Sequence, residues 1–471
     1  MKLLFSLLFF AVSAMLYAQP KEWTLEDCVK YALDNNIQIK RVGLQSDIAR
    51  NNYQQSKFQA LPNLNGGGSH NLNYGRHVDS YTNEIINTNV TSDNFYVQSS
   101  LNLFSGFQTI NSIQQNRYLM EASLESLEKA KNDICIQIAT VFLQVLSGEE
   151  ALDIAKNQFE VTHLQLEKTK KLVEVGNKAR GDLLEMQAQE ANDKYNITVA
   201  NNNLKIAYIT LVQLLELKSV DDFKIRIPDS IAIDHSNVLA TVDEIYKEAE
   251  TKLPEIKSAE NQLRSYEKGL SVMRGQLLPS LSLTGTISTG YSNARQKTVG
   301  FQNVTSTIGY LNDDVSQPVI NHTVYPVSGN YPFSSQLKDN QGKSISLNLS
   351  VPIFNQFQVQ KNVRNAKIRV SDYDYNLQQA KKSLYAEIQK AHANALAAFD
   401  QYTSANEAVI ANEEVFKYNQ QKYDVGMISS VDFNIVKNDL TKAKSNFIQA
   451  KYDYIFKIKV LDFYRGVQIV L

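Results

Sequence analysis

The sequence has little cysteine, little proline and almost no excess charge. Its 471 residues include 2 cysteines and 9 prolines, and the formal net charge is −1. Two cysteines are too few for a disulfide scaffold, so we interpret Cys28 and Cys135, which fall in separate predicted helices, as small buried hydrophobic residues. A disulfide between them is the less favoured alternative. The balanced charge argues against a nucleic-acid partner.

Motifs for catalysis and cofactor binding are also missing. The 6 histidines are scattered, without an H-E-x-x-H pattern or paired cysteines, and there is no G-x-x-x-x-G-K phosphate loop. The neighbouring acids at 221–222 and 313–314 fit loops better than a catalytic pair. The sequence therefore predicts a protein that is not an enzyme and that holds no metal or cofactor.

Long hydrophobic runs are confined to the N-terminus. The first residues contain Lys2, an apolar run from Leu3, and Ala18 before Gln19. This pattern predicts a signal peptide, residues 1–18, rather than a membrane anchor, because the run is shorter than the ~20 residues of a spanning helix. Beyond residue 18 no apolar run is long enough to span a bilayer as a helix. We expect an exported chain that is not a helical membrane protein.

The most informative feature of the sequence is an internal duplication. The stretches LVEVGNKARGDL (172–183) and KYDVGMISSVDF (422–433) match at an offset of 250 residues, which holds from 104 to about 215. Upstream, an offset of 217 aligns Pro62 with Pro279, so the second copy carries 33 extra residues between 279 and 353. We divide the chain into a first repeat, 19–240, and a second repeat, 241–471, and expect pseudo-symmetry.

Each repeat is predicted to contain short helices, two strands and a long helical hairpin. Helices are expected at roughly 37–60 and 254–277, each followed by a proline. Strands are expected at about 61–75 and 94–104, and at about 278–292 and 343–354. Their alternation of apolar and small polar residues suits transmembrane barrel strands, with a soluble antiparallel sheet as the alternative. The predicted apolar faces contain Leu64, Leu72, Phe95, Val97, Leu101, Leu103, Leu281, Leu283, Ile287, Ile345, Leu347 and Leu349.

The predicted hairpins, 105–217 and 355–465, begin with very long helices. About 70 residues without proline, at ~1.5 Å per residue, give a rod of ~105 Å that must pack its apolar stripe against other helices. Gly176 and Gly426 fit a helix C-terminal position with positive φ. Asp182 and Asp432 fit the N-cap or first turn of the returning helices, roughly 182–217 and 432–465.

Four membrane strands per chain cannot close a barrel by themselves. Bacterial single-chain barrels start at eight strands, and an open edge in lipid leaves backbone groups unsatisfied. If the strands cross a membrane, two, three or four copies would share 8, 12 or 16 strands. The long helices would then continue the barrel as a water-filled helical tube.

At this point the chain resembles the TolC-like outer-membrane efflux channels. The resemblance rests on WTLEDCVKYALDNN (23–36), the strand entries ALPNL and LLPSLSL, the joins LNLFSGF and VPIFNQF, and the two Val-Gly turns. It implies a mixed α and β membrane protein: a homotrimer with a shared 12-stranded transmembrane barrel in outer-membrane lipid and a long periplasmic α-helical barrel. It also implies an equatorial belt around 19–36, 218–250 and 466–471. The implied partners are a periplasmic adaptor, docking near Gly176 and Gly426, and an inner-membrane pump or transporter.

The resemblance also implies a gate at the hairpin tips. In the family, a Tyr and an Arg on one hairpin bond to an Asp on the other, and an acidic pair narrows the pore. The matching positions are Tyr423, Asp182 and, for the first ring acid, Asp432. Ile428 stands where the Arg would be and Ile435 where the second acid would be. Helix capping is the plainer role for the two aspartates, and Lys178 or Arg180 are the candidates to replace the missing Arg.

Two further hypotheses follow from the sequence. The 33-residue insertion has the turn residues and scattered aromatics of an exposed loop, which we expect outside the cell, over the barrel mouth. The favoured function is a passive outer-membrane exit channel for efflux or type I secretion. The alternative is a secreted coiled-coil structural or adhesive protein with a soluble β head.

Overall fold

The computed structural model describes residues 22–78, 83, 85–87, 89–221, 223–227 and 240–467. The predicted signal peptide and parts of the predicted belt, 19–21, 222, 228–239 and 468–471, lie outside the described residues. The chain divides into two compact units. A helical unit contains residues up to Asn51, Arg117–Tyr266 and Arg369–Leu471, and a β-rich unit contains Asn52–Asn116 and Glu267–Ile368.

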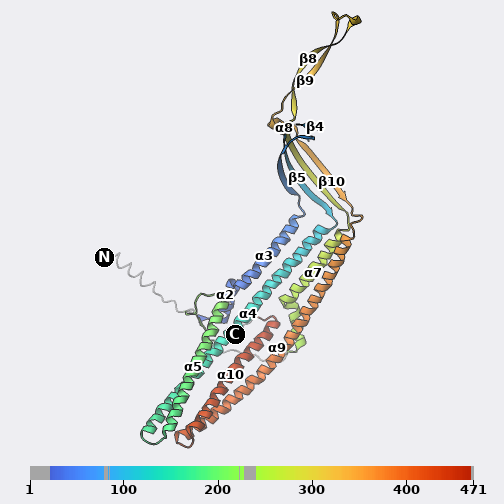
Figure 1. Ribbon diagram of the computed structural model, residues 1–471. Helices are drawn as coiled ribbons and strands as arrows, with labels where there is room; N and C mark the ends of the chain where they lie inside the picture. The colour runs from blue at the N-terminus through green and yellow to red at the C-terminus, as the bar shows by residue number, and fades with distance from the viewer. Residues whose placement is uncertain are drawn as a thin grey trace, which may run out of the picture. The chain divides into compact units, whose positions relative to one another are not determined.

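Two long helical hairpins dominate the helical unit. Helix α4 and helix α9 each have 67 residues, and the returning helices α5 and α10 each have 35. The tight turns that join α4 to α5 and α9 to α10 lie side by side (Figure 1). The bounds are α4 Gln108–Glu174, α5 Arg180–Leu214, α9 Gln358–Asp424 and α10 Ser430–Tyr464.

Shorter helices precede each hairpin and begin with the same local device. In the helix Leu25–Asn35, the hydroxyl of Thr24 accepts from the backbone N–H of Asp27, and the Asp27 side chain accepts from the N–H of Thr24. Thr241 and Glu244 form the same capping box on the helix Val242–Lys252. These short helices and the two that follow them are α2 Leu25–Asn35, α3 Ile37–Phe58, α6 Val242–Lys252 and α7 Pro254–Gly275.

The core of the helical unit consists of apolar clusters between these helices. The largest joins α2, α4, α5 and α10, and its fully buried members include Cys28, Ile138 and Val145. Cys28 is buried as expected, but Cys135 is only half-buried, which corrects that part of the interpretation, and both are free thiols. By length and composition α4 could cross a membrane, but a core helix passes the same test, and 44% of its most apolar window is buried. Its core contacts explain its composition.

The β-rich unit contains a four-stranded antiparallel sheet in the order β10-β7-β5-β2. The register places Leu101, Leu283 and Leu347 directly opposite one another, and Asn102, Ser282 and Asn348 form the next row on the other face. The sheet therefore has one apolar and one small-polar face, because side chains alternate along each strand. Its strands are β2 Asn63–Asn73, β5 Val90–Ser105, β7 Ser280–Ser292 and β10 Gly342–Ser350.

The apolar face of this sheet is exposed in the single chain. Leu64 is 74% exposed, Ile345 84% and Leu349 68%. A bulge between Asn102 and Phe104 changes the alternation near the end of β5, so Phe104, not Leu103, lies opposite Leu281. Leu103 has no partner in this register, so its predicted place on the apolar face stays a prediction. Among the described residues, β2 and β10 each pair on one side only, which leaves two open edges.

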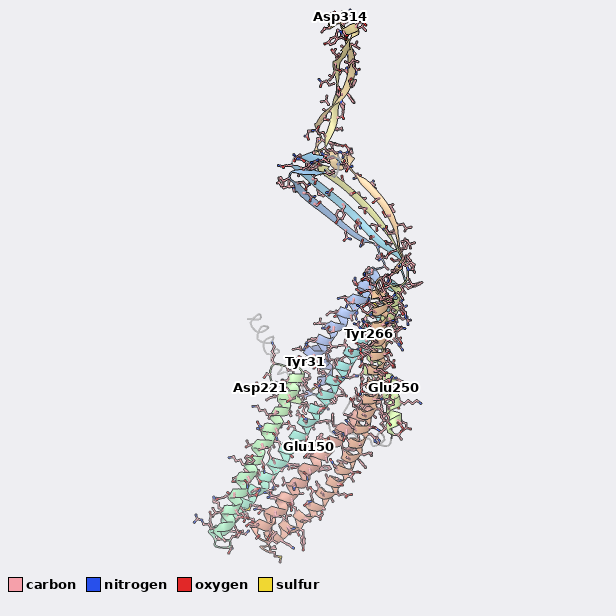
Figure 2. All side chains as sticks on the ribbon, turned by 45° about the vertical axis from the view of Figure 1, so that its right-hand side comes forward. Tyr31, Glu150, Asp221, Glu250, Tyr266 and Asp314 are labelled. Atoms are coloured by element: carbon pink, nitrogen blue, oxygen red, sulfur yellow. The ribbon has the colours of Figure 1, made fainter. Side chains whose placement is uncertain are left out.

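The insertion of the second repeat is mostly strand, which corrects the expectation of a loop. Strand β8 (Gln296–Tyr310) pairs antiparallel with β9 (Pro318–Asn330), and Asp314 lies in the turn between them (Figure 2). The short helix α8 (Phe333–Asp339) follows, and its buried Gln336 bonds to the backbone of Ser292 in both directions, at 3.0 Å each. The alternation of apolar and polar residues is hard to see in the sequence, because bulges interrupt it and because apolar residues lie on both faces of the hairpin.

Two short strand pairs and a single helical turn complete the described chain. The parallel pair β1–β6 lies within the segments that the resemblance assigns to the belt, together with α2 and α6. The pair β3–β4 takes the place in the first repeat that β8–β9 takes in the second. The bounds are β1 Glu22–Trp23, β6 Lys224–Ile225, β3 Arg76–Val78, β4 Ile85–Asn87 and the 3₁₀ turn η2 Leu311–Asp313.

Candidate functional site: the hairpin tips and the seam between the hairpins

The two tips share one backbone conformation. Gly176 and Gly426 have φ values of +79° and +80°, as the sequence predicted for a helix C-terminal glycine. In the first tip the N–H of Asn177 donates to the carbonyl of Leu172 at 2.8 Å, and in the second Met427 donates to Lys422 at 2.8 Å. These bonds satisfy carbonyl groups that the helix end leaves without partners. Each chain reversal is therefore closed by backbone hydrogen bonds and leaves a short exposed turn.

The starts of the returning helices differ between the tips. Ser429 caps α10, because its hydroxyl accepts from the N–H of Asp432 at 3.1 Å and donates to the Asp432 carboxylate at 2.8 Å. The equivalent residue on α5, Ala179, makes no side-chain cap. Asp182 lies in the first turn of α5 and is free to bond elsewhere. The two aspartates therefore occupy equivalent positions with different partners.

Asp182 is bonded to the second hairpin. Ser430 Oγ lies 2.7 Å from Asp182 Oδ1 and 2.8 Å from Glu185 Oε2, and Ser430 is only 1% exposed. The resemblance implied that Tyr423 would bond to Asp182. In the described chain Tyr423 Oη instead lies 3.4 Å from Thr169 Oγ1, so the bridge to Asp182 comes from Ser430.

Tyr423 is held by rings and a cation. Its ring stacks on Phe433 with centroids 4.5 Å apart, and only 4% of Tyr423 is exposed. Lys178 Nζ of the first hairpin lies 4.0 Å from the centre of the Tyr423 ring, a cation–π contact. Lys178, one of the two residues that we considered as a replacement for the missing Arg, thus lies against Tyr423. Ile435, at the position of the second acid, is 54% exposed and brings no charge to the tip.

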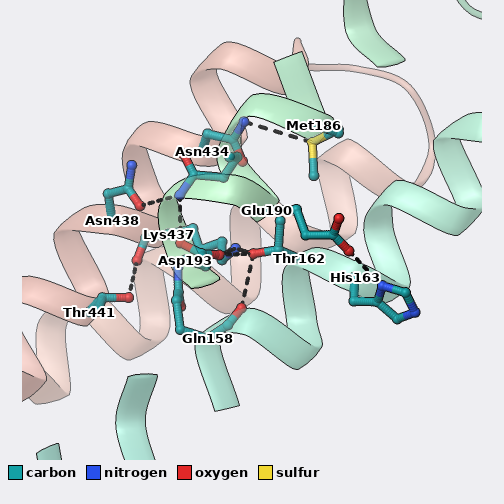
Figure 3. A network of polar contacts seen from close by, with 11 residues as sticks. Gln158, Thr162, His163, Met186, Glu190, Asp193, Asn434, Lys437, Asn438 and Thr441 are labelled. Atoms are coloured by element: carbon teal, nitrogen blue, oxygen red, sulfur yellow. Dashed lines mark hydrogen bonds and ion pairs between the residues drawn. The ribbon is translucent and has the colours of Figure 1, made fainter. Parts of the chain in front are cut away.

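Sequence reasoning missed a buried polar cluster farther along the seam (Figure 3). Lys437 Nζ of α10 lies 3.2 Å from Asp193 Oδ2 of α5, and their side chains are 1% and 2% exposed. Thr162 of α4 accepts from Lys437 and donates to Asp193, and Gln189 Nε2 donates to the other Asp193 oxygen at 2.8 Å. Burial lowers the pKa of Lys437, and Asp193 opposes that shift.

One sequence signal could have revealed this cluster. Lys437 follows Phe433 by four residues and Ser430 by seven, so it occupies the stripe of α10 that faces the first hairpin. At the offset of 250, its counterpart is Gln187, and the counterpart of Asp193 is Ala443. The charged pair therefore occurs once, at a place where the two copies differ.

Other ion pairs between the hairpins are open to water. Lys168 Nζ lies 2.7 Å from Asp424 Oδ1, and the two side chains are 46% and 43% exposed. Glu150, labelled in Figure 2, accepts from Lys451 Nζ at 2.7 Å and from Tyr452 Oη at 2.6 Å. The described residues include no group of acids, histidines and cysteines suited to a metal ion. The contacts of the seam are those of an interface between the two hairpins.

These features define a class of protein. A sheet with an exposed apolar face, open at both edges and formed by a chain with two long helical hairpins, is the architecture of a strand-and-helix membrane channel subunit. The chain belongs to the outer membrane efflux protein family, whose family model matches residues 28–216 and 245–457. It is an outer-membrane exit channel protein, and its helical part belongs in the periplasm.

Relatives and solved structures agree with this assignment. The chain is 20% identical to the outer membrane protein TolC of Vibrio cholerae over 435 residues, covering 92% of this chain and 88% of that relative. It is 21% identical to TolC of Escherichia coli over 434 residues, covering 89% of this chain and 78% of that relative. The Campylobacter jejuni CmeC outer membrane channel matches with a TM-score of 0.74 at 17% identity, covering 94% of this chain and 85% of that chain.

Proposed function

We propose that this chain forms the passive exit duct of a tripartite efflux or type I secretion system. It would receive substrate from a periplasmic adaptor and an inner-membrane pump or transporter and release it outside the cell. The observation that carries this proposal is the sheet, whose apolar face is exposed and whose two edges are open. In lipid the exposed apolar face is favourable. The backbone groups of the open edges are satisfied there once the edges pair with other strands.

Pairing of those edges determines the assembly. Strand β2 of one copy can pair with β10 of the next, so three copies would close a 12-stranded barrel with no edge left. Trimers of this kind would also place the six hairpins in one ring, as a helical barrel below the strands. The equal lengths of α4 and α9, and of α5 and α10, support an internal duplication that makes the six hairpins nearly equivalent.

Transport through this duct would be passive. The sequence has no phosphate-binding loop, and the described residues offer no metal cluster, so we assign the energy source to the pump and no enzymatic activity to this chain. The β8–β9 hairpin would lie at the outer mouth of the barrel. Each of the two repeats, 19–240 and 241–471, would supply two strands to the β-barrel and one hairpin to the helical barrel.

The tips would serve as gate and docking site. Asp182, Tyr423 and Asp432 would form the gate, with Ser430 and Lys178 as partners across the hairpins. The exposed turns at Gly176 and Gly426 would bind the adaptor. Val425 and Met427 are 70% and 75% exposed there, which gives the second tip an apolar surface for such a partner.

Fractionation and conductance test this function together. The full chain should enter detergent extracts of the outer membrane as a heat-modifiable trimer and should give single-channel currents in planar bilayers. A secreted coiled-coil protein with a soluble β head, the alternative function, would stay soluble after washing and give no current. A water-soluble monomer without affinity for bilayers would refute the proposed channel.

A further inference from the structure

The strongest unexplained feature is the buried ion pair between the two hairpins. Lys437 comes from the second hairpin, and Asp193 and Thr162 come from the two helices of the first. Among the described ion pairs that join the hairpins, this one alone has both side chains almost fully buried. Lys437 lies seven residues after Ser430, the first residue of α10, which places it roughly 10 Å along the helix.

The surroundings of this pair are polar and incompletely bonded. Gln158 Nε2, Gln165 Oε1 and Asn434 Oδ1 are buried and have no hydrogen-bond partner in the described chain. Buried polar atoms without partners weaken an interface, because they lose their hydration without replacement. Around Lys437, packing alone is therefore poorly suited to keep the two hairpins together. The ion pair is the strongest attraction between them in this stretch.

A buried pair of this kind responds unequally to single and double substitutions. If one partner is removed, the other charge stays buried and unpaired, which is costly. If both are replaced by apolar residues of similar size, the desolvation cost disappears, and the interface is often as stable as before. In a seam that can open, the unpaired charge regains water when the two hairpins separate, so opening relieves the cost.

We propose that Lys437 and Asp193, bridged by Thr162, form the clamp that positions the second hairpin against the first in the closed gate. This inference rests on the proposed channel function and names a regulation of it. The clamp supplies a charged contact between the hairpins, which Ile428 cannot supply at the tip. Lys437 and Asp193 are positioning residues: they hold the helices that carry Tyr423 and Asp182.

Single and double variants in planar bilayers test the clamp. We expect Lys437→Met and Asp193→Asn each to raise the open probability of the purified trimer by about tenfold or more, because each leaves a buried group unpaired. The double variant Lys437→Met/Asp193→Leu should return to within about threefold of the wild-type value. Spin labels at Asn177 and Met427 should report a longer distance between the tips in the single variants and a near-native one in the double variant.

Two matched controls distinguish the loss of the clamp from the general effect of removing a lysine. Lys168→Met removes the exposed pair with Asp424 between the hairpins, and Lys444→Met removes a pair with Glu413 inside the second hairpin. Both should leave the open probability unchanged, since exposed pairs contribute little. A heat-modifiable trimer band for each variant shows that it has assembled.

The outcomes are distinct. Open probabilities of both single variants equal to wild type, or a double variant as open as the single ones, would overturn the clamp. If Lys437→Met yields no trimer, Asp193→Asn decides in its place, and failure of both to assemble would mean that the pair serves folding rather than gating. Absence of current from wild type and from tip variants alike would instead refute the channel function itself.

Discussion

Ser430 offers the most direct test of the proposed gate at the tips. Its hydroxyl lies within 2.8 Å of both Asp182 and Glu185, but it has one proton and can donate to one carboxylate at a time. Ser430 belongs to α10 and the two acids belong to α5, so the bond joins the two hairpins. The substitution Ser430→Ala removes the bond without adding volume.

The magnitude of this effect follows from the charge of the acceptor and its exposure. A hydrogen bond to a charged group is worth about 1.5–3 kcal/mol. Asp182 and Glu185 are only half-buried, so water replaces part of the lost bond, and the lower end of the range applies. About 1.5 kcal/mol corresponds to roughly a tenfold shift in the ratio of open to closed channels.

The assay is the open probability of the purified trimer in planar bilayers, measured beside its thermal stability. The neighbouring substitution Ser429→Ala is a matched control, because Ser429 caps α10 and bonds within its own hairpin. It should destabilise the start of α10 by about 1 kcal/mol without removing the contact between hairpins. We therefore expect a lower melting temperature from Ser429→Ala and a more open channel from Ser430→Ala.

This reasoning would be refuted by either of two results. Ser430→Ala trimers with wild-type open probability would show that the bond does not bias the gate. Equal opening in Ser429→Ala and Ser430→Ala would show that the gate responds to the stability of α10 and not to the bridge between hairpins.

Three further predictions concern single residues of the hairpins. Asp432→Asn keeps the bonds of the cap but removes the charge, so block by multivalent cations should weaken; unchanged block would place Asp432 outside the pore. Gly426→Ala should destabilise the trimer to thermal unfolding by ~1 kcal/mol, because φ is +80°, whereas Gly181→Ala, in a helical turn with free space, should stabilise it. The hydrogen bond to Glu190 raises the pKa of His163 above 6.5, so its stabilisation is complete below pH 6.5 and is lost as pH rises through the folded value. His163→Gln should flatten the pH dependence of the melting temperature in that window.

Much of the fold could be predicted because its signals are local and repeated. The hairpins were expected to begin at 105 and 355 with helices of about 70 residues, and these helices run from Gln108 to Glu174 and from Gln358 to Asp424. Uninterrupted apolar spacing, an absence of proline and a glycine at the end specify such a helix without tertiary information. The four strands could be placed for the same reason, since their faces alternate over most of their length, with the bulge in β5 as the exception.

The β8–β9 hairpin escaped prediction because its pattern is irregular. Bulges beside Gly300 and Gly309 shift the register twice, and in the regular stretch between them apolar residues such as Phe301 and Tyr325 fall on opposite faces. The bulge near Leu103 has the same effect on a smaller scale. An inserted residue moves every later side chain to the other face, and no period of two then survives in the sequence.

The tip contacts escaped prediction for a different reason. The positions of Asp182 and Tyr423 could be inferred, but their partners depend on how two hairpins meet, and the nearest signal lies about 250 residues away along the chain. Ser430 is an unremarkable residue in sequence, one position after a cap. Its role arises because α10 turns it toward Asp182, which only the tertiary arrangement determines.

The differences between the two copies are as informative as their likeness. Ala179 and Ser429 occupy equivalent places, yet the absence of a cap on α5 leaves Asp182 available to the second hairpin. Lys437 and Gln187 are also equivalent, and only the former is charged. In a ring of six similar hairpins, contacts that were all alike would give every seam the same strength. In the proposed trimer, residues that differ between the copies would make the seam inside each chain distinct from the seam between chains, so that one could open while the other holds.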